Sequence, residues 1–125
     1  MTISLNLSAN YNFEPFKQGT DWSESFDFTT STGIIPLTGW HARMMIKDEP
    51  HSGGTTLLDI TDTASSNGYI TITGASGRIS IFVPDGKTDT FTWSKGYYDI
   101  KLTDTSALEL IPLYGEVTVL RNVVP

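Results

Sequence analysis

The sequence has no cysteine among its 125 residues. It therefore has no disulfide framework, no thiolate zinc site and no cysteine nucleophile. Uninterrupted apolar runs are only a few residues long, so we expect no membrane-spanning helix and no membrane partner. The first residues alternate apolar and polar types without a basic start or an apolar centre, so we expect no signal peptide.

Basic residues are also scarce. Lys and Arg number 8 against 14 Asp and Glu, which gives a net charge of −6. The basic residues are scattered along the chain, whereas a nucleic-acid-binding protein needs clustered cations to neutralise phosphates. We therefore expect no nucleic-acid partner. Charged residues of both signs make up 18% of the chain, which is low for a helical protein and typical of a β domain.

Apolar residues recur with a period of two, the spacing that places them on one face of a β-strand. The alternation is clearest after Gly39, where Trp40, Ala42, Met44 and Ile46 are separated by more polar residues. Further strands are predicted at 2–7, 22–29, 57–60, 69–73, 78–83, 97–103, 108–114 and 116–120. Turn residues separate these stretches, so the pattern predicts an all-β, immunoglobulin-like antiparallel β-sandwich of about eight short strands, with Trp40 in its core.

Three places depart from this regular pattern. Residues 84–94 contain the only candidate helix, a single turn near residues 85–94 that Asp85 or Thr88 would cap. Pro112 cannot donate a hydrogen bond within a sheet, so we expect an edge strand or a bulge there. Gly115 is expected to let the chain turn or bulge before its last strand.

The composition does not change along the chain, so residues 1–125 are interpreted as one β-sandwich domain. Residues 1–21 form an N-terminal strand and an aromatic arm, which we expect to take part in subunit contacts. The first strand is regular and uncharged, and such an edge favours pairing with another chain. The predicted interface residues are Tyr11, Phe13, Phe16, Ile3, Leu5, Trp93 and Tyr97.

The sequence contains no recognisable catalytic, cofactor-binding or metal-binding motif. His41 and His51 have no partners at the spacing of metal ligands. Residues 85–89 lack the alternating oxygen ligands and the closing Glu of a calcium loop, and residues 52–55 lack the Lys of a phosphate-binding loop. We therefore predict no enzyme activity, no cofactor and no metal. Exposed Trp and Tyr side chains leave a carbohydrate-binding role open.

Several short motifs carry a family resemblance. They are residues 19–22 (GTDW) before a Phe-rich strand, 36–44 (PLTGWHARM), 68–70 (GYI), 77–81 (GRISI), 88–93 (TDTFTW), 97–104 (YYDIKLTD) and 113–117 (LYGEV). In this order they resemble the small β-sandwich proteins and domains of tailed bacteriophages and prophages, which are found in baseplates, in receptor-binding components and near tail-fibre genes. The resemblance covers most of the chain from residue 19 onward.

The resemblance implies a non-enzymatic structural protein of the virion, made in the host cytoplasm and assembled in the tail, the baseplate or the fibre-attachment apparatus that adheres to the host. Its partners would be other virion structural proteins and further copies of itself, because virion parts are usually symmetric oligomers. Two alternatives stay open. One is a capsid decoration or head–neck accessory protein, and the other is a carbohydrate-binding module that contacts a glycan of the host surface.

Overall fold

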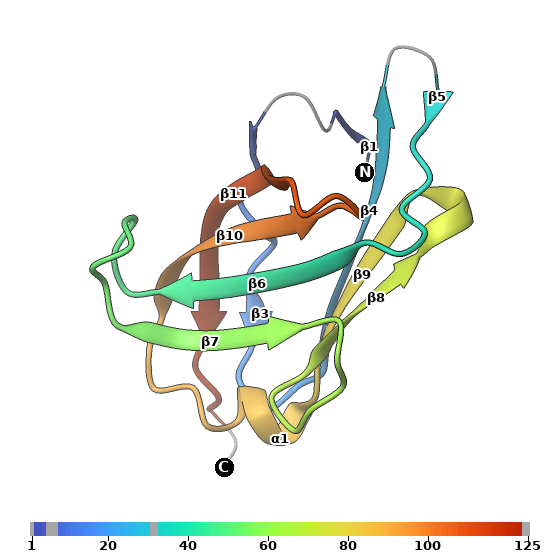
Figure 1. Ribbon diagram of the computed structural model, residues 1–125. Helices are drawn as coiled ribbons and strands as arrows, with labels where there is room; N and C mark the ends of the chain where they lie inside the picture. The colour runs from blue at the N-terminus through green and yellow to red at the C-terminus, as the bar shows by residue number, and fades with distance from the viewer. Residues whose placement is uncertain (1, 5–7, 31–32, 124–125) are drawn as a thin grey trace.

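Two β-sheets packed face to face form the molecule (Figure 1). The computed structural model describes residues 2–4, 8–30 and 33–123, with side chains described for 8–29 and 33–123. In sheet A the strand order is β1 (Thr2–Ser4), β4 (Trp22–Thr30), β9 (Arg78–Val83) and β8 (Tyr69–Thr73), and β5 (Gly33–Ile34) pairs with β4. In sheet B the order is β2 (Ala9–Asn10), β11 (Glu109–Leu120), β10 (Lys95–Thr103), β6 (His41–Lys47) and β7 (Thr56–Thr61), and β3 (Phe16–Lys17) also pairs with β11.

The predicted all-β sandwich is confirmed. The four main strands of sheet A and the strands β11, β10, β6 and β7 of sheet B follow the order of an immunoglobulin-like sandwich. The pairs among the long strands are antiparallel, as expected. The other strands are β5 in sheet A and β2 and β3 in sheet B. The three short strands of the N-terminal segment, β1, β2 and β3, pair in parallel with β4 or β11. The N-terminal segment therefore contributes to both sheets.

The core lies between the sheets and is built from the inward positions that the period-two pattern marks. In β6, Ala42, Met44 and Ile46 are buried and alternate with more exposed residues. In β9 the buried residues are Ile79, Ile81 and Val83. Trp40 precedes β6 and is only partly buried, although it packs against the core. The prediction of a core position for Trp40 therefore holds only in part.

The bulge predicted at Pro112 is confirmed. The pairing of β11 with β10 shifts register between Ile100 and Leu102, opposite the stretch that contains Pro112. Pro112 and Leu113 are both buried, which breaks the alternation of inward and outward side chains at that point. The prediction for Gly115 is wrong, because β11 continues through it. Gly115 is instead needed for close approach, since a Cβ there would lie 2.1 Å from the carbonyl oxygen of Tyr11.

The aromatic arm is part of the core of its own chain. Phe13 is 3% exposed, and its ring stacks on that of Tyr98 with 4.3 Å between centroids. The ring of Phe16 stacks on Trp22 at 4.5 Å. The prediction that Phe13 contacts another subunit is therefore wrong, since aromatic burial within the chain accounts for it. Tyr11 and Phe16 keep part of their surface exposed.

The predicted helical turn is α1 (Asp85–Thr88), which occupies the first part of the expected segment. The N-cap residue is Pro84, which has no side-chain cap. Asp85 Oδ1 accepts a hydrogen bond from the Gly86 N–H at 2.7 Å within the first turn. Asp21, at the end of the arm, adds a cap from outside the turn, because its Oδ1 accepts a hydrogen bond from the Asp85 N–H at 2.8 Å. Among the described residues, no helix is long and apolar enough to cross a membrane.

Candidate functional site

A groove on the outer face of sheet B is the main candidate site. It has a volume of about 510 Å³ and lies over β6, β10 and β11, with the β6–β7 loop (residues 48–55) along one side. We call it the tyrosine groove, because Tyr97 and Tyr114 line it. The other lining residues are Asn10, Arg43, Met45, Lys47, Glu49, Pro50, His51, Ser52, Tyr98, Asp99, Lys101, Ile111, Gly115 and Glu116.

The strand register brings the groove residues together from distant parts of the chain. On β10, Asp99 lies opposite Met45 of β6 on one side and Tyr114 of β11 on the other. One step along, Tyr97 lies opposite Lys47 and Glu116. Side chains directly opposite each other on neighbouring strands are about 5 Å apart at Cβ. The centre of the groove is therefore a row of Met45, Asp99 and Tyr114.

The β6–β7 loop is held in place by polar contacts. The carboxylate of Asp48 accepts a hydrogen bond from the Thr55 N–H at 2.7 Å. Lys47 Nζ donates to the Ser52 carbonyl oxygen at 2.7 Å. Glu49 and His51 lie 2.7 Å apart at their Oε2 and Nε2 atoms. These bonds fix the side of the groove that the loop forms.

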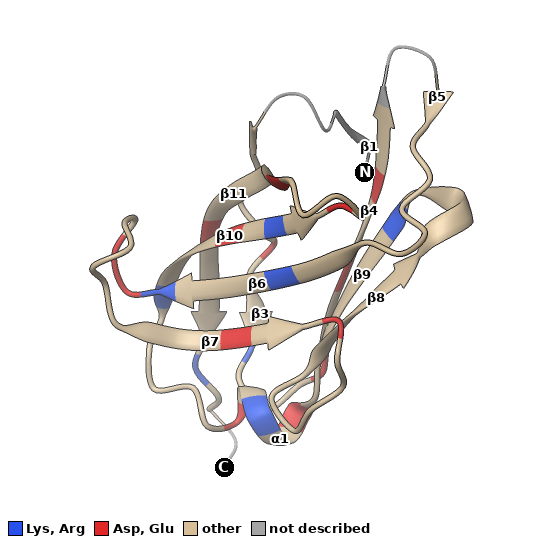
Figure 2. Ribbon diagram, viewed as in Figure 1, with Lys and Arg blue, Asp and Glu red and all other residues tan. Residues whose placement is uncertain are grey.

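Charges within the groove balance. Its lining contains three cationic residues, Arg43, Lys47 and Lys101, and three acidic ones, Glu49, Asp99 and Glu116, whereas the whole chain carries −6. Figure 2 shows basic residues on β6 and β10, the strands that form the groove floor, alongside acidic ones. A partner that fills the groove therefore meets little net charge.

Ion pairs on this face hold several of the charged side chains. Arg43 binds Asp59 through two hydrogen bonds of 2.9 and 2.6 Å, and this guanidinium lowers the pKa of the Asp59 carboxyl. Lys95 lies 3.2 Å from Glu116, which raises the pKa of the lysine. Asp99 is exposed and has no ion pair among the described residues. It is the carboxylate of the groove that is free to accept hydrogen bonds from a ligand.

The composition of the groove suits binding. Tyr, Met and Arg are enriched at the centres of protein interfaces, and Tyr supplies a flat apolar ring with a polar hydroxyl. Tyr114 is 39% exposed and Ile111 is 40% exposed, so both present apolar surface to solvent. The arrangement can therefore bury apolar area while Asp99 supplies a directional acceptor.

The predicted interface residues do not form one site. Tyr97 lies in the groove, and Trp93 is partly buried against Phe91, with 4.8 Å between ring centroids. Tyr11 and Phe16 lie in the arm. The Ile3 side chain and Leu5 fall outside the described part of the structure. Sequence reasoning missed Tyr114 and Asp99, although the period of two places both on the outward face of their strands.

The two histidines each have one acidic neighbour. His41 Nδ1 lies 2.9 Å from Asp62 Oδ2, and its side chain is 74% exposed. His51 pairs with Glu49. Within the described ranges, no group of three or more His, Cys, Asp or Glu residues is placed to hold a metal ion.

One carboxylate points into the sandwich. Glu24 lies on β4 between the inward-facing Trp22 and Phe26 and is half-buried. Burial raises the pKa of Glu24, the Trp22 indole offsets part of the rise, and Glu14 adds to it. Glu24 thus interrupts the apolar face that Trp22 and Phe26 form on β4, and it lies on the same side of the strand as both.

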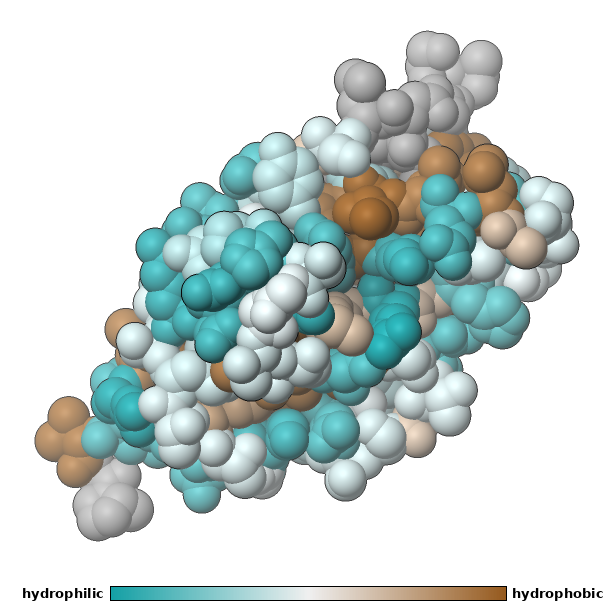
Figure 3. Space-filling view, turned by 60° about the vertical axis from the view of Figure 1, so that its left-hand side comes forward, coloured by the Kyte–Doolittle hydropathy of each residue, from teal (hydrophilic) through white to brown (hydrophobic). Residues whose placement is uncertain are grey.

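Apolar surface also gathers at one end of the molecule. Figure 3 shows it as a patch beside the grey residues, on a face that is otherwise hydrophilic or mixed.

No model of a known protein family matches the chain, and no curated protein matches it.

Proposed function

We propose that this chain is a non-enzymatic structural protein of a tailed-phage virion, assembled in the tail, baseplate or fibre-attachment apparatus through its tyrosine groove. The observation that carries the proposal is the groove itself, in which Tyr97, Tyr114, Met45 and Arg43 gather on the outer face of sheet B. These residue types characterise the centre of a protein interface. The phage setting rests on the resemblance of the sequence motifs.

The expected occupant of the groove is another virion structural protein with a neutral, partly apolar surface. Charge balance in the groove supports this choice, because a strongly charged partner would gain nothing from it. A capsid decoration or head–neck protein would use the same surface. The location of the chain in the particle therefore distinguishes this role from a role in the tail, baseplate or fibre-attachment apparatus.

Electron microscopy of intact particles, combined with mass spectrometry of purified virions, tests the proposal. The chain should be present in several copies per particle, with the groove covered by a neighbouring protein. Tyr97→Ala with Tyr114→Ala should reduce incorporation at least tenfold, whereas Ile34→Ala, which removes a side chain that is 61% exposed outside the groove, should leave it unchanged. Absence of the chain from purified particles would refute the proposal. Finding it only on the capsid or neck would favour the decoration role.

A second candidate function, glycan binding, is favoured by the combination of Tyr97, Tyr114 and Asp99 in one groove. The apolar face of a sugar ring stacks on an aromatic side chain, and its hydroxyls donate to a carboxylate. A neutral sugar also fits a groove of balanced charge. A glycan array should then give a signal that Tyr97→Ala and Asp99→Asn each reduce. An array without signal would exclude this function.

A further inference from the structure

Strand β8 is an unprotected edge of sheet A. It pairs with β9 on one side, and no other described strand pairs with it on the opposite side. Its sequence, Tyr-Ile-Thr-Ile-Thr, contains neither a charge nor a proline. Proteins usually guard such edges with charges, prolines, bulges or very short strands. None of these devices is present in β8.

The other described edges are protected. The strands of the N-terminal segment are two or three residues long. The remaining edge, β7, carries Asp59 in an ion pair with Arg43, and its pairing with β6 is irregular between Ile46 and Lys47. Among the described strands, β8 is therefore the longest edge without a charge.

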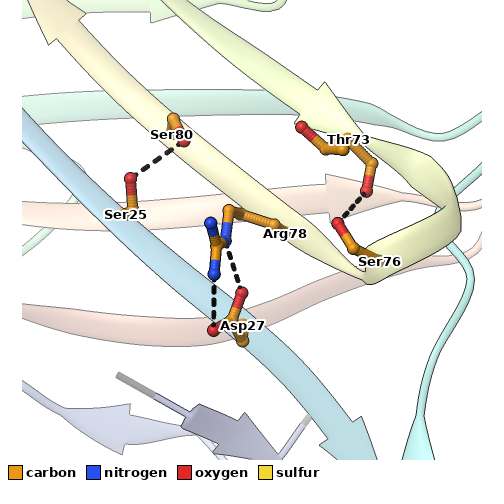
Figure 4. Close-up of polar contacts among 6 residues, drawn as sticks. All are labelled: Ser25, Asp27, Thr73, Ser76, Arg78 and Ser80. Atoms are coloured by element: carbon orange, nitrogen blue, oxygen red, sulfur yellow. Dashed lines mark hydrogen bonds and ion pairs between the residues drawn. The ribbon is translucent and has the colours of Figure 1, made fainter.

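The backbone of β8 is available for a further strand. In an antiparallel pair, alternate residues direct their N–H and C=O groups away from the partner. Side-chain bonds on the outer face of sheet A join β4 to β9, as Figure 4 shows for Ser25 with Ser80 and for Asp27 with Arg78. At the end of β8, the Thr73 carbonyl accepts a hydrogen bond from Ser76 Oγ at 3.2 Å. That carbonyl is therefore already engaged, and the backbone groups open to a further strand are those of the other β8 residues that point away from β9.

A pocket of about 440 Å³ runs along this edge, between the two sheets. Leu37 and Trp40 line it from the segment that enters β6, and Ile70 and Ile72 line it from β8. Trp40 and Ile72 are only partly buried, although both pack against the core. A strand added to β8 would place its own inward side chains over this pocket. These side chains would cover the exposed parts of Trp40 and Ile72.

We propose that β8 pairs with β8 of a second copy of this chain, antiparallel, about a two-fold axis at Thr71. A two-fold axis perpendicular to the sheet keeps the inward faces of both copies on the same side of the joined sheet. Inward side chains of one copy must therefore lie opposite inward side chains of the other. Centring on Thr71 meets this condition and pairs all five residues. Thr71 then lies opposite its own copy, each Ile70 lies opposite Ile72, and each Tyr69 lies opposite Thr73.

The pairing that β8 offers favours a second copy over another partner. The strand is complementary to itself, because isoleucine meets isoleucine inward and threonine meets threonine or tyrosine outward. Repulsion between two copies that each carry −6 opposes this contact and weakens it, although β8 itself brings no charge into it. The two-fold contact closes on itself, so it produces a dimer. The proposal does not depend on where the protein acts.

Pairing five residues is a small contact beside the roughly 1,600 Å² of a standard protein interface, so we expect a weak dimer. Sedimentation velocity of the purified chain, from a few micromolar to about 1 mM, should show a monomer–dimer equilibrium. Thr71→Lys and Thr71→Glu should each abolish the dimer, since like charges would lie directly opposite one another. An equimolar mixture of the two should restore it. Thr56→Lys and Thr56→Glu, at an exposed position on β7, are the matched controls and should leave it unchanged.

Cross-linking tests the register, because the chain has no cysteine of its own. Opposite residues of an antiparallel pair have Cα atoms about 5 Å apart, within the range of a disulfide. Thr71→Cys should therefore give a covalent dimer on mild oxidation. Thr73→Cys should not, because the two cysteines would lie about 13 Å apart along the strands. A wild-type chain that stays monomeric to 1 mM, a mixture that fails to restore the dimer, or equal cross-linking of both variants would refute the pairing. These experiments use the isolated chain, so they can fail while the virion proposal holds.

Discussion

The hydroxyl of Tyr98 donates a hydrogen bond to the backbone carbonyl of Tyr11 at 2.7 Å and so ties β10 to the N-terminal arm. Tyr98 is 2% exposed. The arm runs beside β11 through further backbone bonds, from Tyr11 N–H to Tyr114 and from Phe13 N–H to Glu116. A single phenol therefore anchors, from the core side, a segment that otherwise lies on a sheet edge.

Replacing Tyr98 with phenylalanine should reduce the free energy of unfolding by about 1–2 kcal/mol, because the Tyr11 carbonyl loses a buried partner. Burial raises the pKa of Tyr98 well above 10, and nearby Tyr11 and Glu24 add to the rise. The unfolded chain loses this proton near pH 10, whereas the folded chain keeps it. The contribution of Tyr98 to the free energy of unfolding should therefore be fully present below pH 10 and should fall as the pH rises above 10.

Urea unfolding between pH 8 and 11 measures both effects. The decline above pH 10 should be shallower in Tyr98→Phe than in the wild type, since the variant lacks the group that titrates. Tyr97→Phe is the control, because the Tyr97 side chain lies in the open groove. Equal slopes in Tyr98→Phe and the wild type would contradict the assignment.

Thr88 is the buried polar link between α1 and the end of the arm, with 0% exposure. Its Oγ1 donates to the Thr20 carbonyl at 2.7 Å and accepts from the Gly19 N–H at 3.1 Å. Thr88→Val keeps the shape and leaves both backbone groups without this partner, so it should cost about 2 kcal/mol in chemical denaturation. Thr92→Val, at an exposed site, should change stability by less than about 0.5 kcal/mol. A neutral Thr88→Val would show that water replaces the lost bonds.

Gly115 and Gly86 form a matched pair for the same substitution. A Cβ at Gly115 would lie 2.1 Å from the Tyr11 carbonyl oxygen, whereas a Cβ at Gly86 meets nothing within 4 Å. Gly115→Ala should therefore push the arm away from β11 and lower the melting temperature, at a cost of about 1–3 kcal/mol. Gly86→Ala, within α1, should raise stability by about 0.5–1 kcal/mol. Amide exchange should show loss of protection at Tyr11 and Phe13 in the first variant only.

The strands were predictable because a period of two leaves a direct mark in the sequence. The stretch from Ala42 to Ile46 is an example, and the bulge at Pro112 followed from its missing N–H. The path of the arm was not predictable, because its short strands are defined by pairing with a partner about 100 residues away in the sequence. The same applies to the role of Gly115, which depends on the arm lying beside it.

The groove was predictable only in part. Tyr97 was among the predicted interface residues, but Tyr114 and Met45 join it through strand register. Alternation shows that these residues point outward. It does not show which strands are neighbours, so it cannot show which outward residues meet. The cap of α1 by Asp21 escaped prediction for the same reason, since the two lie 64 positions apart.

Balanced charge in the tyrosine groove has a consequence for ionic strength. Added salt shortens the range of electrostatic forces to about 10 Å at 0.1 M and less at higher concentration. Two copies of a chain with net charge −6 repel one another less under those conditions, so contact between copies at β8 becomes easier. The groove has three charges of each sign, so its affinity for a neutral partner changes little. The two surfaces of one small protein thus differ in their dependence on salt, and ionic strength alone separates self-association from partner binding.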